Sequence, residues 1–204
     1  MKNAILPMLD RLGPKRIVIA SSAPPIRYPD CYGIDMSTLG ELVAFRALVN
    51  LLDNGERGLG TGERGLGNGE RGSDCALREA LEQSKHLHVS TRSTRPEPFN
   101  PLAPLYARFT EEQHCREIAR LLTPPGMKAE VVVVYQTVEN LRLCLIGSTI
   151  NSKLETLNSK LTAHNSKLSI GDWYFTGDYP TPGGYKVLYK ALANYLARKT
   201  DRSY

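Results

Sequence analysis

Apolar residues recur at helical spacing in several stretches of the chain. In each stretch, hydrophobic side chains three and four residues apart would share one face of a helix. The stretches cover residues 5–12, 42–52, 73–85, 110–122 and 188–196. Thr38-Leu39-Gly40-Glu41 and Thr110-Glu111-Glu112-Gln113 match the capping box, in which a hydroxyl and a carboxylate or amide side chain bond free backbone N–H groups. We therefore expect helices to begin at these two motifs.

Two runs rich in β-branched residues predict strands. Arg16 to Ser21 has no polar alternation, a pattern typical of a strand buried on both faces in a parallel sheet. Glu130 to Tyr135 is the stronger run, and Thr137 after it is suited to cap a short helix through Leu141. The order helix, turn, buried strand is half of a βαβ unit. The pattern predicts an α/β fold, with flanking helices and a C-terminal helical tail.

Two unrelated repeats, both with a period of seven, interrupt this pattern. Gly-Glu-Arg-Gly recurs within residues 55–72, and Asn-Ser-Lys-Leu recurs within residues 145–170. Glycine disfavours helices, so the first repeat predicts a solvated loop, and it lacks the preceding strand and Lys-Ser/Thr ending of a phosphate-binding loop. We interpret both repeats as in-frame duplications of DNA. They divide the chain into segments 1–54, 55–72, 73–144, 145–170 and 171–204.

Composition and charge narrow the function classes. The chain has 204 residues, 41% hydrophobic and 23% charged, as in ordinary soluble proteins. Its net charge of +5 is too small to indicate nucleic-acid binding. The four cysteines form no Cys-x-x-Cys pair, which favours free thiols in a reducing compartment over a metal or redox motif. Pro7 and Asp10 break the N-terminal apolar run, so neither a signal peptide nor a membrane span is expected, and we expect a cytoplasmic protein.

Three strings in a fixed order carry a family resemblance. The first runs from Lys15 to Met36 and begins KRIVIASSAPPIRYP, the second is KAEVVVVYQT from Lys128, and the third is GDWYFTGDYPTPGG from Gly171. The first and third are specific, whereas the second would be weak alone. Together they resemble the C-terminal part of the glutamine phosphoribosylpyrophosphate amidotransferase (amidophosphoribosyltransferase) family, particularly its Bacteroidetes branch. The resemblance implies a partial type I phosphoribosyltransferase-like sheet.

The resemblance also implies an activity and the residues it needs. The intact family enzymes make 5-phosphoribosylamine from phosphoribosylpyrophosphate and glutamine, the first step of purine biosynthesis, and require Mg²⁺. They use a cysteine nucleophile exposed behind the initiator Met, and an Asp-Asp pair followed by a phosphate loop. Here residue 2 is Lys, no Asp-Asp occurs, and the only adjacent acids, Glu111-Glu112, lie in a predicted first helical turn. We therefore expect the catalytic loop to lie before Met1, and no catalytic residue or cofactor in this fragment.

Candidate ligand residues follow the first predicted strand. Arg27, Tyr28 and Asp35 lie in a loop at the carboxyl end of a parallel strand, where α/β proteins build their sites. Substrate binding and simple loop-to-helix packing are both open at this point.

The resemblance also raises the question of an iron–sulfur cluster. Some family members bind an iron–sulfur cluster, but Tyr174 and Gly171 occupy two of the cysteine positions and Cys31 is one residue off a third, so we expect no cluster and no metal site. Separately, the paired glycines Gly183-Gly184 allow either an anion-binding turn ahead of the last helix or, as is commoner, a turn that needs positive φ.

Three functional hypotheses remain open. The chain is a fragment of an amidophosphoribosyltransferase that is inactive alone, a non-catalytic binding or assembly module that interacts with a family oligomer or a nucleotide, or a pseudogene product.

Overall fold

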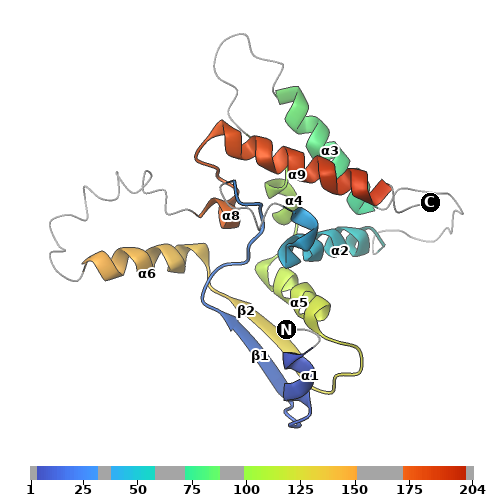
Figure 1. Ribbon diagram of the computed structural model, residues 1–204, viewed down its shortest axis with the longest axis vertical. Coiled ribbons are helices and arrows are strands. Elements are labelled where there is room, and N and C mark those ends of the chain that lie inside the picture. The colour runs from blue at the N-terminus through green and yellow to red at the C-terminus, as the bar shows by residue number, and fades with distance from the viewer. Residues whose placement is uncertain (1–3, 32–37, 58–71, 88–98, 151–171, 201–204) are drawn as a thin grey trace, which may run out of the picture.

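The computed structural model describes residues 4–31, 38–57, 72–87, 99–150 and 172–200. Figure 1 shows the two strands and the first helix at one end of the molecule and most of the other helices at the opposite end. In chain order the elements are α1 (Ile5–Asp10), β1 (Arg16–Ser21), the 3-10 helix η1 (Leu39–Glu41), α2 (Val43–Arg57), α3 (Gly72–Leu87), α4 (Ala103–Tyr106), α5 (Glu111–Leu122), β2 (Glu130–Tyr135), α6 (Val138–Ile150), α8 (Trp173–Thr176) and α9 (Pro182–Thr200).

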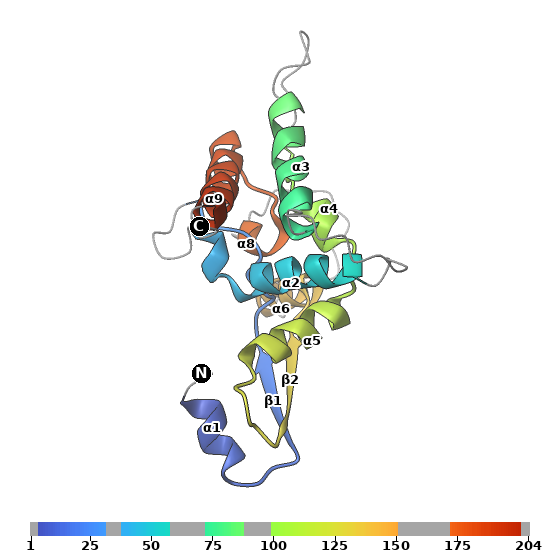
Figure 2. The ribbon, with the colours of Figure 1, turned by 90° about the vertical axis from the view of Figure 1, so that its right-hand side faces the viewer.

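The two predicted strands form one parallel sheet. β1 pairs with β2 in a register that runs from Arg16 opposite Glu130 to Ser21 opposite Tyr135. α5 leads directly into β2 and packs beside the sheet (Figure 2). The described part of the chain is therefore a mixture of helices and a two-stranded parallel sheet, as the coarse prediction of an α/β fold required.

The prediction that β1 is buried on both faces is wrong. Ile17 is buried, and α1 and α5 cover this face of the sheet. On the other face Val18 in β1 is 57% exposed and Val134 in β2 is 51% exposed. β-branched side chains favour the extended backbone whether or not a second layer covers them, so the run identifies the strand but not its burial.

α1 also packs differently from its sequence pattern. The predicted apolar stripe included Ile5 and Met8, yet these side chains are 47% and 60% exposed, whereas Leu6 is buried. Leu6 packs with Ile17 and Ala129 at the sheet. Leu9, which belongs to the predicted stripe, is half-buried against the same cluster, so the face of α1 that meets the sheet overlaps only in part with the predicted one.

The helical end contains the main hydrophobic core. Many of its fully buried side chains come from α2, α3 and α9, among them Phe45, Leu77 and Leu192. The predicted inner face of the C-terminal helix is confirmed, since Leu188, Leu192 and their neighbours on that face are buried and Tyr195 packs against the core.

One of the two predicted capping boxes forms. Thr110 accepts a hydrogen bond from the Gln113 backbone N–H, and the Gln113 side chain accepts one from the Thr110 N–H, so α5 begins as predicted. The prediction for Thr38 is wrong, because its side chain makes no capping bond. Leu42 adopts an extended backbone conformation that separates η1 from α2, so the long helix begins at Val43 instead.

Several helices extend further than predicted. The Thr137 hydroxyl caps α6 as expected, accepting from the Asn140 N–H at 3.1 Å, but α6 continues past Leu141 to Ile150. α2 ends at Arg57 and α3 begins at Gly72, so helices enter both ends of the first repeat. The rest of that repeat and residues 151–170 of the second repeat lie outside the described residues.

The two glycines at Gly183-Gly184 do not form a positive-φ turn. Positive φ occurs at Gly13, Gly126 and Gly177 among the described glycines. Gly183 and Gly184 instead lie in the first turn of α9. A Cβ on Gly184 would lie 2.6 Å from Cδ1 of Tyr179, so close packing, not backbone conformation, excludes a side chain there.

Candidate functional site

The loop after β1 is joined to the short helix α8. The backbone N–H groups of Arg27 and Tyr28 both donate to the carbonyl oxygen of Tyr174, at 2.9 and 3.0 Å. Nearby, the Trp173 indole donates to the Asp30 carboxylate at 3.1 Å. The Tyr179 hydroxyl donates to the Pro29 carbonyl. The first and third strings of the resemblance therefore lie side by side, although most of the chain separates them in sequence.

Arg27 is the charged centre of this cluster. Its guanidinium Nη2 donates to both carboxylate oxygens of Glu111 at 2.5 Å, and its Cζ lies 5.2 Å from the centroid of the Tyr106 ring. The Tyr106 hydroxyl donates to the Arg27 carbonyl at 3.2 Å. Glu111 lies in the first turn of α5, as predicted, where its charge also complements the helix dipole. The guanidinium is thus held by a carboxylate and an aromatic face of the protein itself.

Tyr28 lies deeper than Arg27. Its side chain is 2% exposed and its ring meets the Tyr106 ring edge-on, with centroids 5.5 Å apart. Burial raises the pKa of Tyr28 to about 12, although the neighbouring Arg27 charge acts in the opposite direction. The phenol therefore stays protonated at neutral pH and is not a general base there.

Gly177 permits this packing around Tyr28. It ends α8 in the left-handed conformation with φ of 79°, and a Cβ would lie 2.9 Å from Cζ of Tyr28 and still closer to the Asn100 amide. Both the backbone angle and the lack of space exclude a side chain. Gly177 in the third string is thus explained by contact with Tyr28 in the first string.

The sequence analysis did not identify His114, which lies beside this cluster. His114 is 3% exposed, and its Nε2 lies 3.2 Å from the Tyr106 carbonyl oxygen. Burial lowers the pKa of His114, opposed by the hydrogen bond to Tyr106. A signal was available, because His114 precedes Ile118 by four residues and so shares its buried face of α5.

A second buried polar group stabilises the next turn of α5. Glu117 is 7% exposed and accepts hydrogen bonds from the Arg120 guanidinium and from the Asn50 amide of α2 at 2.8 Å. Burial opposes its ionisation, but the bonds from Arg120 and Asn50 prevail and lower the pKa of Glu117. This carboxylate therefore joins α5 to α2.

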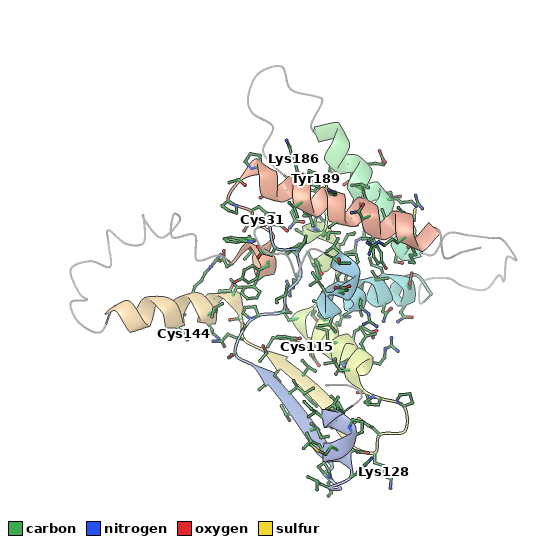
Figure 3. The ribbon with its side chains drawn as sticks, in the orientation of Figure 1. Cys31, Cys115, Lys128, Cys144, Lys186 and Tyr189 are labelled. Atoms are coloured by element: carbon green, nitrogen blue, oxygen red, sulfur yellow. The ribbon has the colours of Figure 1, made fainter. Side chains whose placement is uncertain are left out.

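The described residues contain neither a group of side chains that could bind a metal ion nor a disulfide. There, no three His, Cys, Asp or Glu side chains lie close enough together to hold a metal ion. Cys31, Cys75, Cys115 and Cys144 are free thiols, and Figure 3 shows Cys31, Cys115 and Cys144 well separated. Asp35 and Gly171 lie outside the described residues.

The cluster is arranged to hold the loop in place. Arg27 is paired with Glu111, and both backbone N–H groups at Arg27 and Tyr28 are used within the protein. These contacts support the packing interpretation of the two residues, and their role in substrate binding stays a prediction.

No helix in the described part of the chain is both long enough and apolar enough to cross a membrane.

Comparison with known proteins gives one local relationship. A stretch of 41 residues, 20% of this chain, is 54% identical to the amidophosphoribosyltransferase of Pasteurella multocida (strain Pm70). The chain is partly related to amidophosphoribosyltransferases. A stretch of the same length is 51% identical to the amidophosphoribosyltransferase of Haemophilus influenzae (strain ATCC 51907 / DSM 11121 / KW20 / Rd). Each match covers 8% of the length of that relative. No family model matches the chain, and no solved structure matches it significantly.

Proposed function

We propose that this chain is a fragment related to the C-terminal part of an amidophosphoribosyltransferase and that it has no such activity alone. The local identity to two amidophosphoribosyltransferases carries the proposal. In this interpretation the seven-residue repeats are insertions that add no function.

The arrangement of the three resembling strings supports the relationship. The first contains β1 and its loop, the second contains β2, and the third contains α8. β1 pairs with β2, and the loop after β1 bonds to Tyr174 in α8. Strings that are far apart in sequence therefore form one structural unit. This is expected if they descend together from one ancestral fold.

The chemistry of the family explains the proposed inactivity. Ammonia release requires a thiolate nucleophile, and transfer to the sugar requires acidic groups beside the ribose and a phosphate loop. The sequence has no Asp-Asp pair, and Glu111 and Glu112 are bound to Arg27 and Arg116. A polypeptide of these 204 residues therefore lacks the groups that the reaction uses.

An activity assay tests the second half of the proposal. The purified chain, supplied with phosphoribosylpyrophosphate, Mg²⁺ and ammonia, should release no pyrophosphate above the uncatalysed rate. The Pasteurella multocida enzyme, assayed in parallel, is the positive control. Pyrophosphate release in proportion to the amount of chain would overturn the proposed inactivity.

A chimera tests the relationship separately. The 41-residue stretch that matches the Pasteurella multocida enzyme would replace its equivalent there. We expect the chimera to fold and retain activity, because about half of the residues are already identical. A control chimera carries the same residues in scrambled order. Equal loss of activity in both would contradict a structural relationship.

A second candidate function is an assembly module that binds an intact amidophosphoribosyltransferase. The exposed apolar face at Val18 and Val134 favours it, since uncovered apolar surface often marks an interface. The chain should then co-purify with the intact enzyme, and Val18→Glu with Val134→Glu should abolish the association. Leu143→Glu, at an exposed apolar position on α6, is the matched control. Failure of the wild-type chain to co-purify would remove this candidate.

A further inference from the structure

A pocket of about 760 Å³ lies between η1 and the C-terminal half of α9. η1 contributes Leu39, Gly40 and Glu41, preceded by Thr38, and α9 contributes the opposite wall. The volume is within the range of about 300–1,000 Å³ that small-molecule sites occupy. The pocket and the Arg27 cluster have no residue in common.

Two basic side chains line one side of this pocket. Lys190 and Arg198 both lie on α9, with Asn194 midway between them. At a rise of 1.5 Å per residue their Cα atoms are about 12 Å apart along the helix axis. Both side chains are long enough to converge on one ligand between them. Lys199 also lines the pocket, but it is bound to Asp74.

The two basic side chains of the pocket have no charged partner among the described residues. Elsewhere in the described part of the chain, several arginines form ion pairs, for example Arg16 with Glu130, Arg27 with Glu111 and Arg142 with Asp172. Within the described residues, the side chains of Lys190 and Arg198 form neither an ion pair nor a hydrogen bond, although Glu41 lines the same pocket. Two cationic groups in one concave site raise the local positive potential.

The remaining lining groups can bind hydroxyls. Glu41 offers a carboxylate acceptor, Asn194 an amide donor and acceptor, and Thr38 a hydroxyl that is not used to cap η1. Gly40, which has no side chain, leaves space between η1 and Tyr195. A Cβ there would lie only 3.3 Å from the Tyr195 ring.

We propose that the pocket between η1 and α9 binds a small phosphorylated polyol, such as a sugar phosphate. Lys190 and Arg198 hold the phosphate group by charge-assisted hydrogen bonds, while Glu41 and Thr38 bind hydroxyl groups of the same molecule. The ligand needs both features, since the cationic side of the pocket faces a wall with an acidic and a hydroxyl side chain.

Calorimetric titration of the full 204-residue chain tests this proposal. The probes are ribose 5-phosphate, glucose 6-phosphate and glycerol 3-phosphate, with inorganic phosphate and glucose as the incomplete ligands. At least one phosphorylated probe should bind at least about tenfold more tightly than either incomplete ligand, because each of those lacks half of the contacts. Equal affinity for inorganic phosphate, or no binding of any phosphorylated probe, would overturn the proposal.

Substitutions then locate the binding site. Lys190→Gln with Arg198→Gln should weaken binding of the phosphorylated probe by at least about tenfold, since charge-assisted bonds to the phosphate are lost. Lys186→Gln is the matched control: Lys186 is an exposed lysine on α9 outside the pocket (Figure 3). It should leave the affinity unchanged. Glu41→Gln should weaken the phosphorylated probe but not inorganic phosphate. Binding unaffected by the double substitution would place the ligand elsewhere and overturn the assignment.

Discussion

The helical end and the sheet end of the molecule are stabilised to different extents. At the helical end, Phe45, Leu77 and Leu192 are fully buried where α2, α3 and α9 meet. At the sheet end, two strands bury one face and expose Val18 and Val134 on the other. Because a two-stranded sheet has little stability of its own, the sheet end depends on the rest of the protein.

α5 connects the two ends. It packs against β2 on one side and against α2 on the other. Ile118 in α5 is fully buried with Ala44 and Ala47 of α2 and with Val133 of β2. The comparison shows that the sheet is covered on one face only, by α1 and α5, and that α5 is itself held by the larger core.

The largest expected effect is at the centre of the helical end. Phe45 is fully buried and its ring meets the Tyr195 ring edge-on at 4.9 Å. Phe45→Ala should lower the free energy of unfolding by about 3–5 kcal/mol, because the substitution leaves a cavity. Urea denaturation followed by circular dichroism measures this. Phe45→Leu, which keeps most of the volume, should cost less than about 1.5 kcal/mol. Equal losses for both would show that packing at this position does not support the core.

A smaller effect is expected where α9 begins. Gly184→Ala places a methyl group against the Tyr179 ring, and should destabilise the protein by about 1–3 kcal/mol through overpacking. Gly183→Ala is the matched control, since its Cβ would meet nothing closer than 3.5 Å. It should be neutral or stabilise by up to about 1 kcal/mol. Thermal unfolding of both variants distinguishes close packing from a general requirement for glycine.

The junction between the two ends should be sensitive to acid. Burial depresses the pKa of His114 below its ordinary 6.5, beside the charges of Arg27 and Glu111. Below about pH 6.5 the unfolded chain therefore binds a proton that folded His114 resists, and stability falls as the pH decreases. Urea midpoints at about pH 7.5 and about pH 5.5 should differ more in the wild type than in His114→Gln. An equal pH dependence in the two proteins would assign the effect to other groups.

The smallest effects are expected on the exposed face of the sheet. Val18→Ser and Val134→Ser should each change the free energy of unfolding by less than about 0.5 kcal/mol, because both side chains already contact solvent. Val133→Ser, at the buried neighbour in β2, is the matched comparison and should cost about 1–3 kcal/mol. A loss at Val18 as large as that at Val133 would show that this face is covered in solution.

Local patterns predicted the features that depend on neighbours in sequence. The inner face of α9 at Leu188 and Leu192 follows from helical periodicity alone, and the cap at Thr110 follows from residues three apart. Both strands were recognisable for the same reason.

Features set by distant residues could not be predicted in this way. The exposure of Val18 depends on which elements cover the sheet, and the requirement for Gly184 depends on the ring of Tyr179. Within the candidate site, Arg27 and Tyr28 were identified, but their partners Glu111, Tyr106 and Tyr174 come from three other elements. The helical periodicity of α5 could have predicted the burial of His114. No sequence pattern indicated which residues line the pocket beside α9.

The bonds from Arg27 and Tyr28 to the Tyr174 carbonyl have a consequence for the order of folding. The loop after β1 is synthesised long before its partner Tyr174 in α8. At about 5–20 residues per second, the ribosome needs on the order of ten seconds to reach Tyr174 after Tyr28. During that time Ile17 and Tyr28 have neither β2 nor α8 to pack against. The apolar residues of β1 and its loop must therefore be kept from aggregating until β2 and α8 emerge.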